Sequence, residues 1–246
     1  MSSVVDYAPF GAGLLAMTLL TVAAGRWAGT GIGWFPLWAI LRASLQLTAV
    51  ALLLRGILAV PWTVALFVVL MLSTASWTAA GRLDGLWHGR RTAAVGVLAG
   101  ASTTLAVILA LGLVDVQVRY VVAVAGIIIG NSMTAATLAG RTFLRGCRAR
   151  SDEIEAWFSL GATPARAHGE IGREAARESL LPTLDQTKST GLVTLPGAFV
   201  GALFGGASPA EAAQFQLVVL VGIALTMTVT SIVVTRLAGR SPYLLR

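Results

Sequence analysis

Seven long blocks of apolar residues, separated by short polar stretches, constrain the fold of this chain more than any other feature. Each block holds roughly 17 to 24 residues, and at about 1.5 Å per residue such a helix crosses a hydrocarbon core of about 30 Å. The chain is 56% hydrophobic and only 12% charged, which is far from the mix of a soluble domain. We therefore predict an all-α, polytopic integral membrane helical bundle, with spans at about 8–25, 36–54, 61–80, 93–113, 119–140, 190–206 and 213–237.

The first apolar block is predicted to be a retained helix. No Lys or Arg precedes it, so it lacks the basic region that opens a cleaved signal peptide. No shift of composition or linker marks a second domain. We expect residues 1–246 to form a single transmembrane domain.

The positions of the basic residues predict how the chain is oriented. Basic residues that flank spans are retained in the cytoplasm. If the N-terminus lies outside, the outer side holds only Arg55 and Arg119, while the inner loops and a tail that ends at Arg246 hold nearly all the others. Seven crossings then place the C-terminus in the cytoplasm. The formal net charge of +7 reflects this topology and attraction to anionic membrane lipid, and no nucleic-acid partner is expected.

The longest polar region, about residues 141–190 between the fifth and sixth predicted spans, begins with the signals of a short helix. Ser151 is a suitable N-cap, and carboxylates that include Glu153 and Glu155 follow in the first turn. Negative charge there favours the positive end of the helix dipole. We expect this helix to stop at Gly161.

A second helix is predicted directly after an elbow at residues 161–164. Thr163 is its expected N-cap and Pro164 its first residue, a position where a missing N–H costs nothing. Pro182 is expected to end or kink it. The helix carries an acidic stripe at i, i+4 and i+8, with arginines close by, formed by Glu170, Glu174 and Glu178.

The short helix before the elbow carries more apolar surface than water favours, from Ile154, Trp157, Phe158 and Leu160. One interpretation places this surface on the membrane interface or on the inner end of the bundle itself. The other lets it dock into a groove on a soluble partner. The spacing alone leaves both open.

Several segments carry a resemblance to a known family. EAWFSLG, residues 155–161, resembles the cytoplasmic EAA loop of ABC transporter permeases, with Trp157 in place of the second alanine. GIIIGNSMTAAT from Gly126, EIEAWFSLGATP from Glu153 and DQTKSTGLVTLPGAFVGALFGGASP from Asp185 resemble the FetB-like family of bacterial iron-export ABC permeases. Plant relatives of that family are associated with aluminium tolerance and sugar-nucleotide export.

The resemblance implies that this chain is the membrane permease subunit of an exporter of iron or another metal, in a bacterial inner membrane. It further implies two copies of the chain in a complex with two ATPase subunits. The residues that would couple to the ATPase are Glu153, Glu155, Trp157, Phe158, Gly161, Ala162, Thr163 and Pro164. Two alternatives stay open: a permease for a non-metal cargo such as a sugar nucleotide or an amphiphile, and a passive channel or membrane scaffold.

The residues themselves place ATP hydrolysis on another polypeptide. A P-loop needs two glycines at fixed positions before a Lys-Ser or Lys-Thr pair. The chain has one Lys-Ser pair, Lys188-Ser189, and its glycine positions hold Pro182 and Thr187. Because no predicted span holds a histidine that could activate a nucleophile, we expect no enzyme activity and no cofactor on this chain, with ATP and Mg²⁺ bound by the partner.

The transport path is expected among the polar residues and breaks within the spans. Arg42 and Gln46 share one face of the second span, and an intramembrane charge indicates function by default, although Arg42 lies close enough to the inner end to snorkel. Asn131, Ser132 and Thr134 contact either cargo or neighbouring helices. The remaining predicted path residues belong to the sixth span, which Pro196 should kink or partly unwind: Lys188, Thr190, Thr194, Pro196, Gly197 and Gly201.

Two glycine patterns would permit close helix contact, because small residues let backbones approach. They are Gly126 with Gly130, and the face formed by Gly197, Gly201 and Gly205.

No metal ligands can be identified from the sequence. The predicted spans contain no Asp, Glu, His or Cys, which are the side chains that Fe²⁺ would be expected to use. Iron as the cargo is therefore implied by the resemblance alone.

Overall fold

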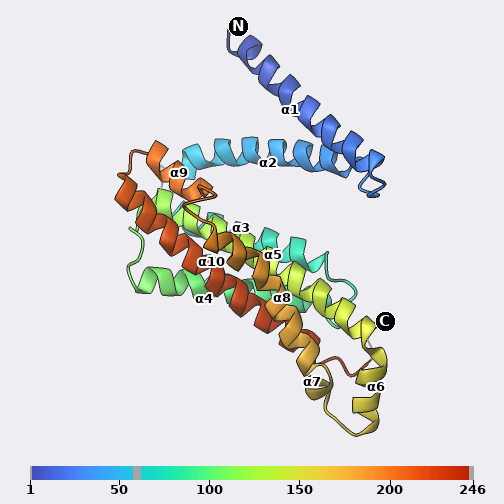
Figure 1. Ribbon diagram of the computed structural model, residues 1–246. Helices are drawn as coiled ribbons and strands as arrows, with labels where there is room; N and C mark the ends of the chain where they lie inside the picture. The colour runs from blue at the N-terminus through green and yellow to red at the C-terminus, as the bar shows by residue number, and fades with distance from the viewer. Residues whose placement is uncertain (1, 58–61, 244–246) are drawn as a thin grey trace. The chain divides into compact units, whose positions relative to one another are not determined.

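The computed structural model describes residues 2–57 and 62–243. Pro61, where the third span is predicted to begin, and Arg246 lie outside the described residues, as does the side chain of Arg55. Every named element in the described part of the chain is an α-helix, which confirms the predicted helical membrane fold (Figure 1). The helices are α1 (Ser2–Trp27), α2 (Phe35–Ile57), α3 (Thr63–Ala80), α4 (Gly89–Ala110), α5 (Val118–Ala149), α6 (Ser151–Ser159), α7 (Pro164–Ala167), α8 (Gly169–Lys188), α9 (Gly197–Phe204) and α10 (Pro209–Ala238).

The chain divides into two compact units, Met1–Val60 and Pro61–Arg246. In the first unit, α1 and α2 pack together, and the Arg26 guanidinium carbon lies 5.1 Å from the centre of the Trp34 ring. The turn between the two helices needs backbone conformations that only glycine adopts without strain. Its three glycines at positive φ are Gly29, Gly31 and Gly33.

Six helices of the described residues are long and apolar enough to cross a membrane, namely α1, α2, α3, α4, α5 and α10. In the second unit α10 packs against α4, α5, α8 and α9, and α3 packs against α4 and α5. The core between them is built from fully buried side chains that include Val97, Ile128, Ile129, Phe143 and Val234. Five helices, α3, α4, α5, α8 and α10, thus form the framework of this unit.

The closest approach between two of these helices is that of α4 and α10. A Cβ added to Gly100 would overlap the Thr230 hydroxyl oxygen and lie 2.7 Å from the Thr226 carbonyl oxygen. A Cβ on Gly96, one turn away, would overlap a methyl group of Val234. Glycine is therefore required at this face of α4, because any side chain would push the two backbones apart.

Within the described part of the chain, the two glycine patterns identified in the sequence do not lie at such close contacts between helices. A Cβ on Gly130 would meet nothing within 4 Å, and one on Gly126 would meet only the Met71 methyl group at 3.3 Å. Gly197 and Gly201 also face open space. The close contact that these glycines permit is therefore not made between helices of one chain, because small residues permit a close neighbour without supplying one.

The polar region after α5 differs from the prediction at its start. α5 continues to Ala149, nine residues beyond the predicted end of the span, and ends near the elbow. Arg150, rather than Ser151, is the N-cap of α6, and no side-chain hydrogen bond caps that helix. The predicted stop is confirmed, because α6 ends at Ser159 and Gly161 has a φ of 76°.

α8 does not end at Pro182 but runs through it to Lys188. The helix packs against both α5 and α10, and the hydroxyl groups of Ser179 and Ser231 lie 2.8 Å apart in the buried contact with α10. Packing on two sides offsets the one backbone hydrogen bond that proline removes. The predicted helix end at Pro182 is wrong, because it was based on local preference alone, and the alternative, a kink at this residue, stays a prediction.

The predicted sixth span, residues 190–206, is not a continuous helix. Gly191, at a φ of 95°, donates its N–H to the Thr194 carbonyl oxygen at 2.8 Å, and Pro196 is extended. Only the eight residues of α9 follow, about 12 Å of helix. The chain returns toward the start of α10 through α8, this turn and α9 together (Figure 1), which confirms the partly unwound segment expected at Pro196.

Candidate functional site

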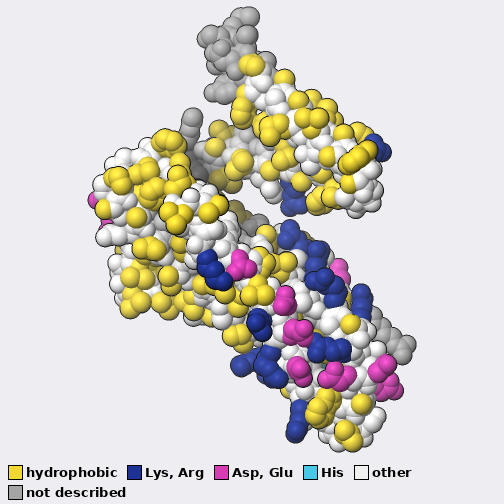
Figure 2. All heavy atoms as spheres, in the orientation of Figure 1, with side chains coloured by type: hydrophobic (Ala, Val, Ile, Leu, Met, Phe, Trp, Pro, Cys, Tyr) yellow, Lys and Arg dark blue, Asp and Glu magenta, His cyan; other side chains and the backbone are white. Residues whose placement is uncertain are grey.

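Charged side chains of the second unit gather at one end. Figure 2 shows Lys, Arg, Asp and Glu over the end formed by α6, α7 and the first half of α8, whereas hydrophobic side chains cover much of the other end. α5 joins the two ends, and its 32 residues span about 48 Å. This length is about 18 Å more than the thickness of a hydrocarbon core of about 30 Å, so α5 is longer than one membrane crossing.

The elbow is anchored to this end by one buried aromatic cluster. Ile154 of α6 is fully buried. The ring of His168, also buried, lies 5.8 Å from the Phe158 ring and 6.0 Å from the Phe143 ring of α5. His168 Nδ1 lies 2.9 Å from the Pro164 carbonyl oxygen, which fixes the turn between α7 and α8. Of the two interpretations of the apolar side of α6, packing on the bundle's own end is therefore correct for Ile154 and Phe158.

The remaining apolar side chain of the elbow faces outward. Leu160 is 81% exposed at the tip, next to Gly161, and Glu153 and Glu155 are exposed on the preceding helix. Trp157 is half-buried beneath Arg166, whose guanidinium carbon lies 5.5 Å from the ring centre. An exposed leucine flanked by carboxylates, on a support anchored by buried rings, is suited to insertion into a groove rimmed with basic residues.

The acidic stripe on α8 is partly used within the chain. Glu174 forms an ion pair with Arg150, which links α8 to the start of α6. Both side chains are partly exposed, so the pair contributes little to stability. The pair joins the start of α6 to α8 at the charged end of the unit.

A polar cavity of about 360 Å³ lies at the other end of α8. Its walls come from α5, from the last turns of α8, from the turn before α9 and from α10. Amide and hydroxyl side chains line it together with apolar ones, and none of its lining residues is charged. The polar lining residues are Asn131, Thr183, Gln186, Thr187, Thr190, Thr194 and Gln216.

Five of the predicted path residues border this cavity: Asn131, Thr190, Thr194, Pro196 and Gly197. The other predicted residues of the second unit lie elsewhere. Ser132 is buried and donates to the Ile129 carbonyl oxygen, Thr134 donates to that of Gly130, and Lys188 is ion-paired with Asp185 at 3.0 Å.

Gly201 does not line the cavity either. Arg42 and Gln46 are exposed on α2, in the first unit, and their assignment to the path stays a prediction.

Gln216 is the cavity residue that sequence reasoning missed. It is 5% exposed, and its side-chain oxygen accepts a hydrogen bond from the Phe199 N–H at 3.1 Å. Pro196, the N-cap of α9, makes no side-chain cap bond. The one sequence signal was a glutamine within an apolar helix, where a polar side chain needs a partner. Gln216, on α10, therefore supplies a hydrogen-bond acceptor to the first turn of α9, where the N-cap residue supplies none.

The cavity chemistry limits what it can hold. The described residues contain no group of three or more His, Cys, Asp or Glu side chains that could hold a metal ion. Neutral oxygen and amide groups bind hydroxyl-rich solutes or a metal ion that carries its own ligands more readily than a bare Fe²⁺ ion.

Comparisons with known proteins place the chain among membrane proteins. A family model described as uncharacterised protein family UPF0014 matches residues 12–243. No solved structure matches the chain. The match to the family model covers nearly the whole chain and includes residues of both compact units.

Three relatives are similar over most of their length. The UPF0014 membrane protein STAR2 of Oryza sativa subsp. japonica is 34% identical over 225 residues, which is 90% of this chain and 79% of the relative. Protein ALUMINUM SENSITIVE 3 of Arabidopsis thaliana is 31% identical, over 89% and 82% of the two chains. The probable iron export permease protein FetB of Escherichia coli strain K12 is 32% identical, over 84% and 81%.

Proposed function

The chain belongs to the UPF0014 family of membrane proteins, and from that membership we propose that it is the permease subunit of an ATP-driven transporter whose ATPase is a separate polypeptide. The bacterial relative is named as a probable iron export permease. We propose the same transport role here, with two copies of this chain and two ATPase subunits in the complex. ATP and Mg²⁺ would be bound by the partner, and this chain would have no enzyme activity of its own.

The observation that carries this proposal is the exposed tip of the elbow. Leu160 presents an apolar side chain at the charged end of the unit, while Ile154 behind it is fully buried. A free surface leucine is unremarkable alone, but this one lies on a support fixed by the His168 ring contacts and by the Arg150–Glu174 ion pair. Because this support is already ordered, the exposed Leu160 side chain is suited to docking with little loss of conformational entropy on binding.

The orientation follows from the same proposal. The elbow must face the cytoplasm to reach an ATPase, which agrees with an N-terminus outside and a C-terminus inside. Binding of ATP would close the two ATPase subunits and move the elbow, and α8 would transmit this motion to the cavity beside Pro196.

Replacing Leu160 by Asp tests the docking role directly. The substitution puts a charge into the proposed apolar contact, so we expect capture of the ATPase subunit by the purified permease to fall at least tenfold, a loss of more than about 1.4 kcal/mol. Co-purification of the two tagged subunits from membranes measures it.

Val116→Asp is the matched control. Val116 is 83% exposed in the loop before α5, at the opposite end of that helix. We expect this variant to capture the ATPase as the unaltered chain does, with equal amounts of both variants in the membrane. Undiminished capture by Leu160→Asp would remove the docking proposal.

For the cargo, we propose iron or another metal, bound together with its own ligands. The support is the bacterial relative's printed function and the neutral lining of the cavity. The same neutral lining favours a second candidate, a metal-free polar solute such as a sugar nucleotide. Stimulation of the reconstituted ATPase by Fe²⁺ with a chelating acid, compared with metal-free solutes, separates the two. Stimulation by neither would leave a passive channel or scaffold as the better interpretation.

A further inference from the structure

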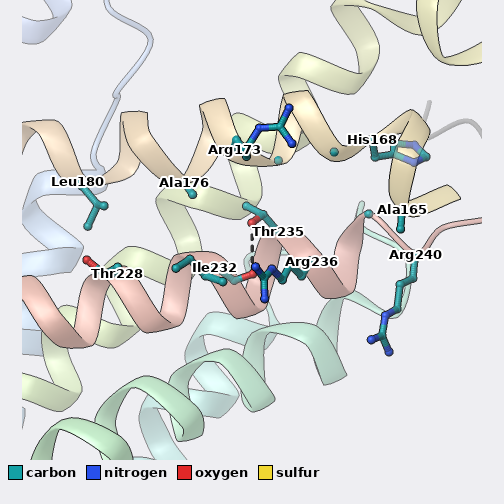
Figure 3. Close-up of a pocket in the computed structure, with 13 residues that line it drawn as sticks. Ala165, His168, Arg173, Ala176, Leu180, Thr228, Ile232, Thr235, Arg236 and Arg240 are labelled. Carbon is teal, nitrogen blue, oxygen red and sulfur yellow. Dashed lines mark hydrogen bonds between the residues drawn. The ribbon is translucent and has the colours of Figure 1, made fainter. Parts of the chain in front are cut away.

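A second and larger cavity, of about 620 Å³, lies between α8 and α10 at the charged end of the unit (Figure 3). Thirteen residues line it, three of them arginines and none of them acidic. Arg173 belongs to α8, Arg236 to the last turn of α10, and Arg240 to the turn that follows α10. The cavity therefore carries a formal charge of +3 from side chains of α8, α10 and the turn after α10.

These three arginines are not used to hold the protein together. Among the described residues, no ion pair or hydrogen bond joins Arg173, Arg236 or Arg240 to an acidic side chain. Glu174, the neighbour of Arg173 on α8, is paired with Arg150 instead. Three like charges around one cavity repel each other, and a bound anion would relieve that repulsion.

A buried polar atom borders the same cavity. His168 is 1% exposed and lines the cavity. Its Nδ1 contacts the Pro164 carbonyl oxygen, which requires a proton on Nδ1, while Nε2 is buried without a partner in the described residues. Buried polar atoms are rarely left unpaired. With the proton on Nδ1, Nε2 is a hydrogen-bond acceptor of a residue that lines the cavity.

The lining changes character along the length of the cavity. Figure 3 shows Arg173, Arg236 and Arg240 toward one end, and Ala176, Leu180 and Ile232 continuing the walls away from them. Thr228 lies eight residues before Arg236, about 12 Å along α10, and Leu180 lies seven residues after Arg173, about 10 Å along α8. The cavity thus has a cationic end and an apolar end that are about 10 Å apart.

We propose that this cavity binds the phosphate group of an anionic phospholipid, with the arginines on the phosphate and the start of an acyl chain along Ala176, Leu180 and Ile232. Guanidinium groups are the side chains best suited to phosphate oxygens. Basic pockets between membrane helices at the cytoplasmic side bind such headgroups. A soluble phosphate ester shares the headgroup chemistry but has no use for the apolar wall.

The first test measures binding of fluorescent phosphatidylglycerol and phosphatidylcholine to the purified full-length chain in a neutral detergent. We expect preference for phosphatidylglycerol, and a loss of about thirtyfold in its affinity in the double variant Arg236→Gln, Arg240→Gln. Arg173→Gln, on the opposite helix, should weaken binding about fivefold on its own.

The matched control removes two arginines of equal charge from α5. Arg141 and Arg145 are exposed and do not line the cavity, so Arg141→Gln, Arg145→Gln should keep the affinity within about twofold. Equal losses in the two double variants would show general surface attraction and overturn the site. Thermal unfolding of each variant confirms that it is folded.

A variant that fills the apolar end distinguishes the source of the phosphate. Ala176→Phe leaves all three arginines in place but blocks the wall beside Leu180. We expect it to lose phosphatidylglycerol binding while glycerol 3-phosphate, added as the soluble probe, binds no more weakly than to the unaltered chain. If glycerol 3-phosphate displaces the lipid from the unaltered chain at equal concentration, the phosphate site stands and its ligand is soluble. If Ala176→Phe binds the lipid unchanged, the proposed acyl path is overturned.

Discussion

At the scale of single residues, Gln216 joins α10 to α9 through one hydrogen bond. Its side chain is buried in an apolar helix, and its acceptor is used by a backbone N–H of another helix, at Phe199. That N–H belongs to the first turn of α9, where four donors have no partner within the helix. One side chain therefore fixes both a wall of the polar cavity and the start of α9.

Gln216→Leu tests this role. Leucine fills a similar volume but accepts no hydrogen bond, so the Phe199 N–H is left unpaired in a medium without water. We expect a loss of about 1–2 kcal/mol in the free energy of unfolding in detergent, and a fall in cargo transport by the reconstituted complex that exceeds any fall in ATPase capture.

The control lies two residues away. Gln214 is exposed on α10, and Gln214→Leu should change neither stability nor transport. If the two variants behave alike, Gln216 has no special part in positioning α9.

At the scale of elements, the contact between α4 and α10 depends on the absence of side chains. Gly100→Ala adds one methyl group where the Thr230 hydroxyl and the Thr226 carbonyl oxygen already lie. The helices must separate or shift, and overpacking of this kind costs about 1–3 kcal/mol. Unfolding of the purified chain in detergent measures the loss.

Gly130→Ala, on α5, is the matched substitution in open space. Alanine favours the helix over glycine by up to about 1 kcal/mol, so this variant should be as stable as the unaltered chain or slightly more stable. A Gly100→Ala variant that is equally stable would show that the helices have room to separate at no cost.

Some helix boundaries are determined by neighbouring residues in the sequence. At the start of α10 a capping box is formed, in which the Glu211 N–H donates to the Ser208 hydroxyl at 3.3 Å and the Ser208 N–H to Glu211 Oε2 at 2.8 Å. The stop of α6 before Gly161 is local in the same sense. The helix end predicted at Pro182 is wrong, because the packing that retains the helix comes from α5 and α10, which are distant in sequence.

At the scale of the whole molecule, the proposed orientation can be tested with single cysteines. Cys147 is buried and free, so Cys147→Ala provides the background. On it, Val116→Cys and Leu160→Cys place exposed thiols at opposite ends of α5. In intact cells, a membrane-impermeant maleimide should label the first and not the second, and permeabilised cells should label both. The reverse pattern would invert the topology.

The sequence predicted the membrane fold and the elbow far better than the cavity. Apolar block length and glycine, proline and capping signals are local, so they can be read along the chain. The cavity joins Asn131, Thr187 and Gln216 from three helices, and their meeting depends on how far α8 reaches beside α5 and α10. The length of α8 could not be predicted, because its last residues, 183–188, are mostly polar and are typical of a loop.

Both cavities have walls on the same two helices, with the arginine-lined one near the start of α8 and the neutral one near its end. Any change in the separation of α8 and α10 alters the two volumes together. Occupants of the two cavities are then thermodynamically linked, and the linkage is reciprocal. If the proposed lipid and the proposed cargo occupy these cavities, a lipid that tightens cargo binding by some factor must itself be held more tightly by the same factor when cargo is present. The lipid composition of the membrane would then affect the proposed transport.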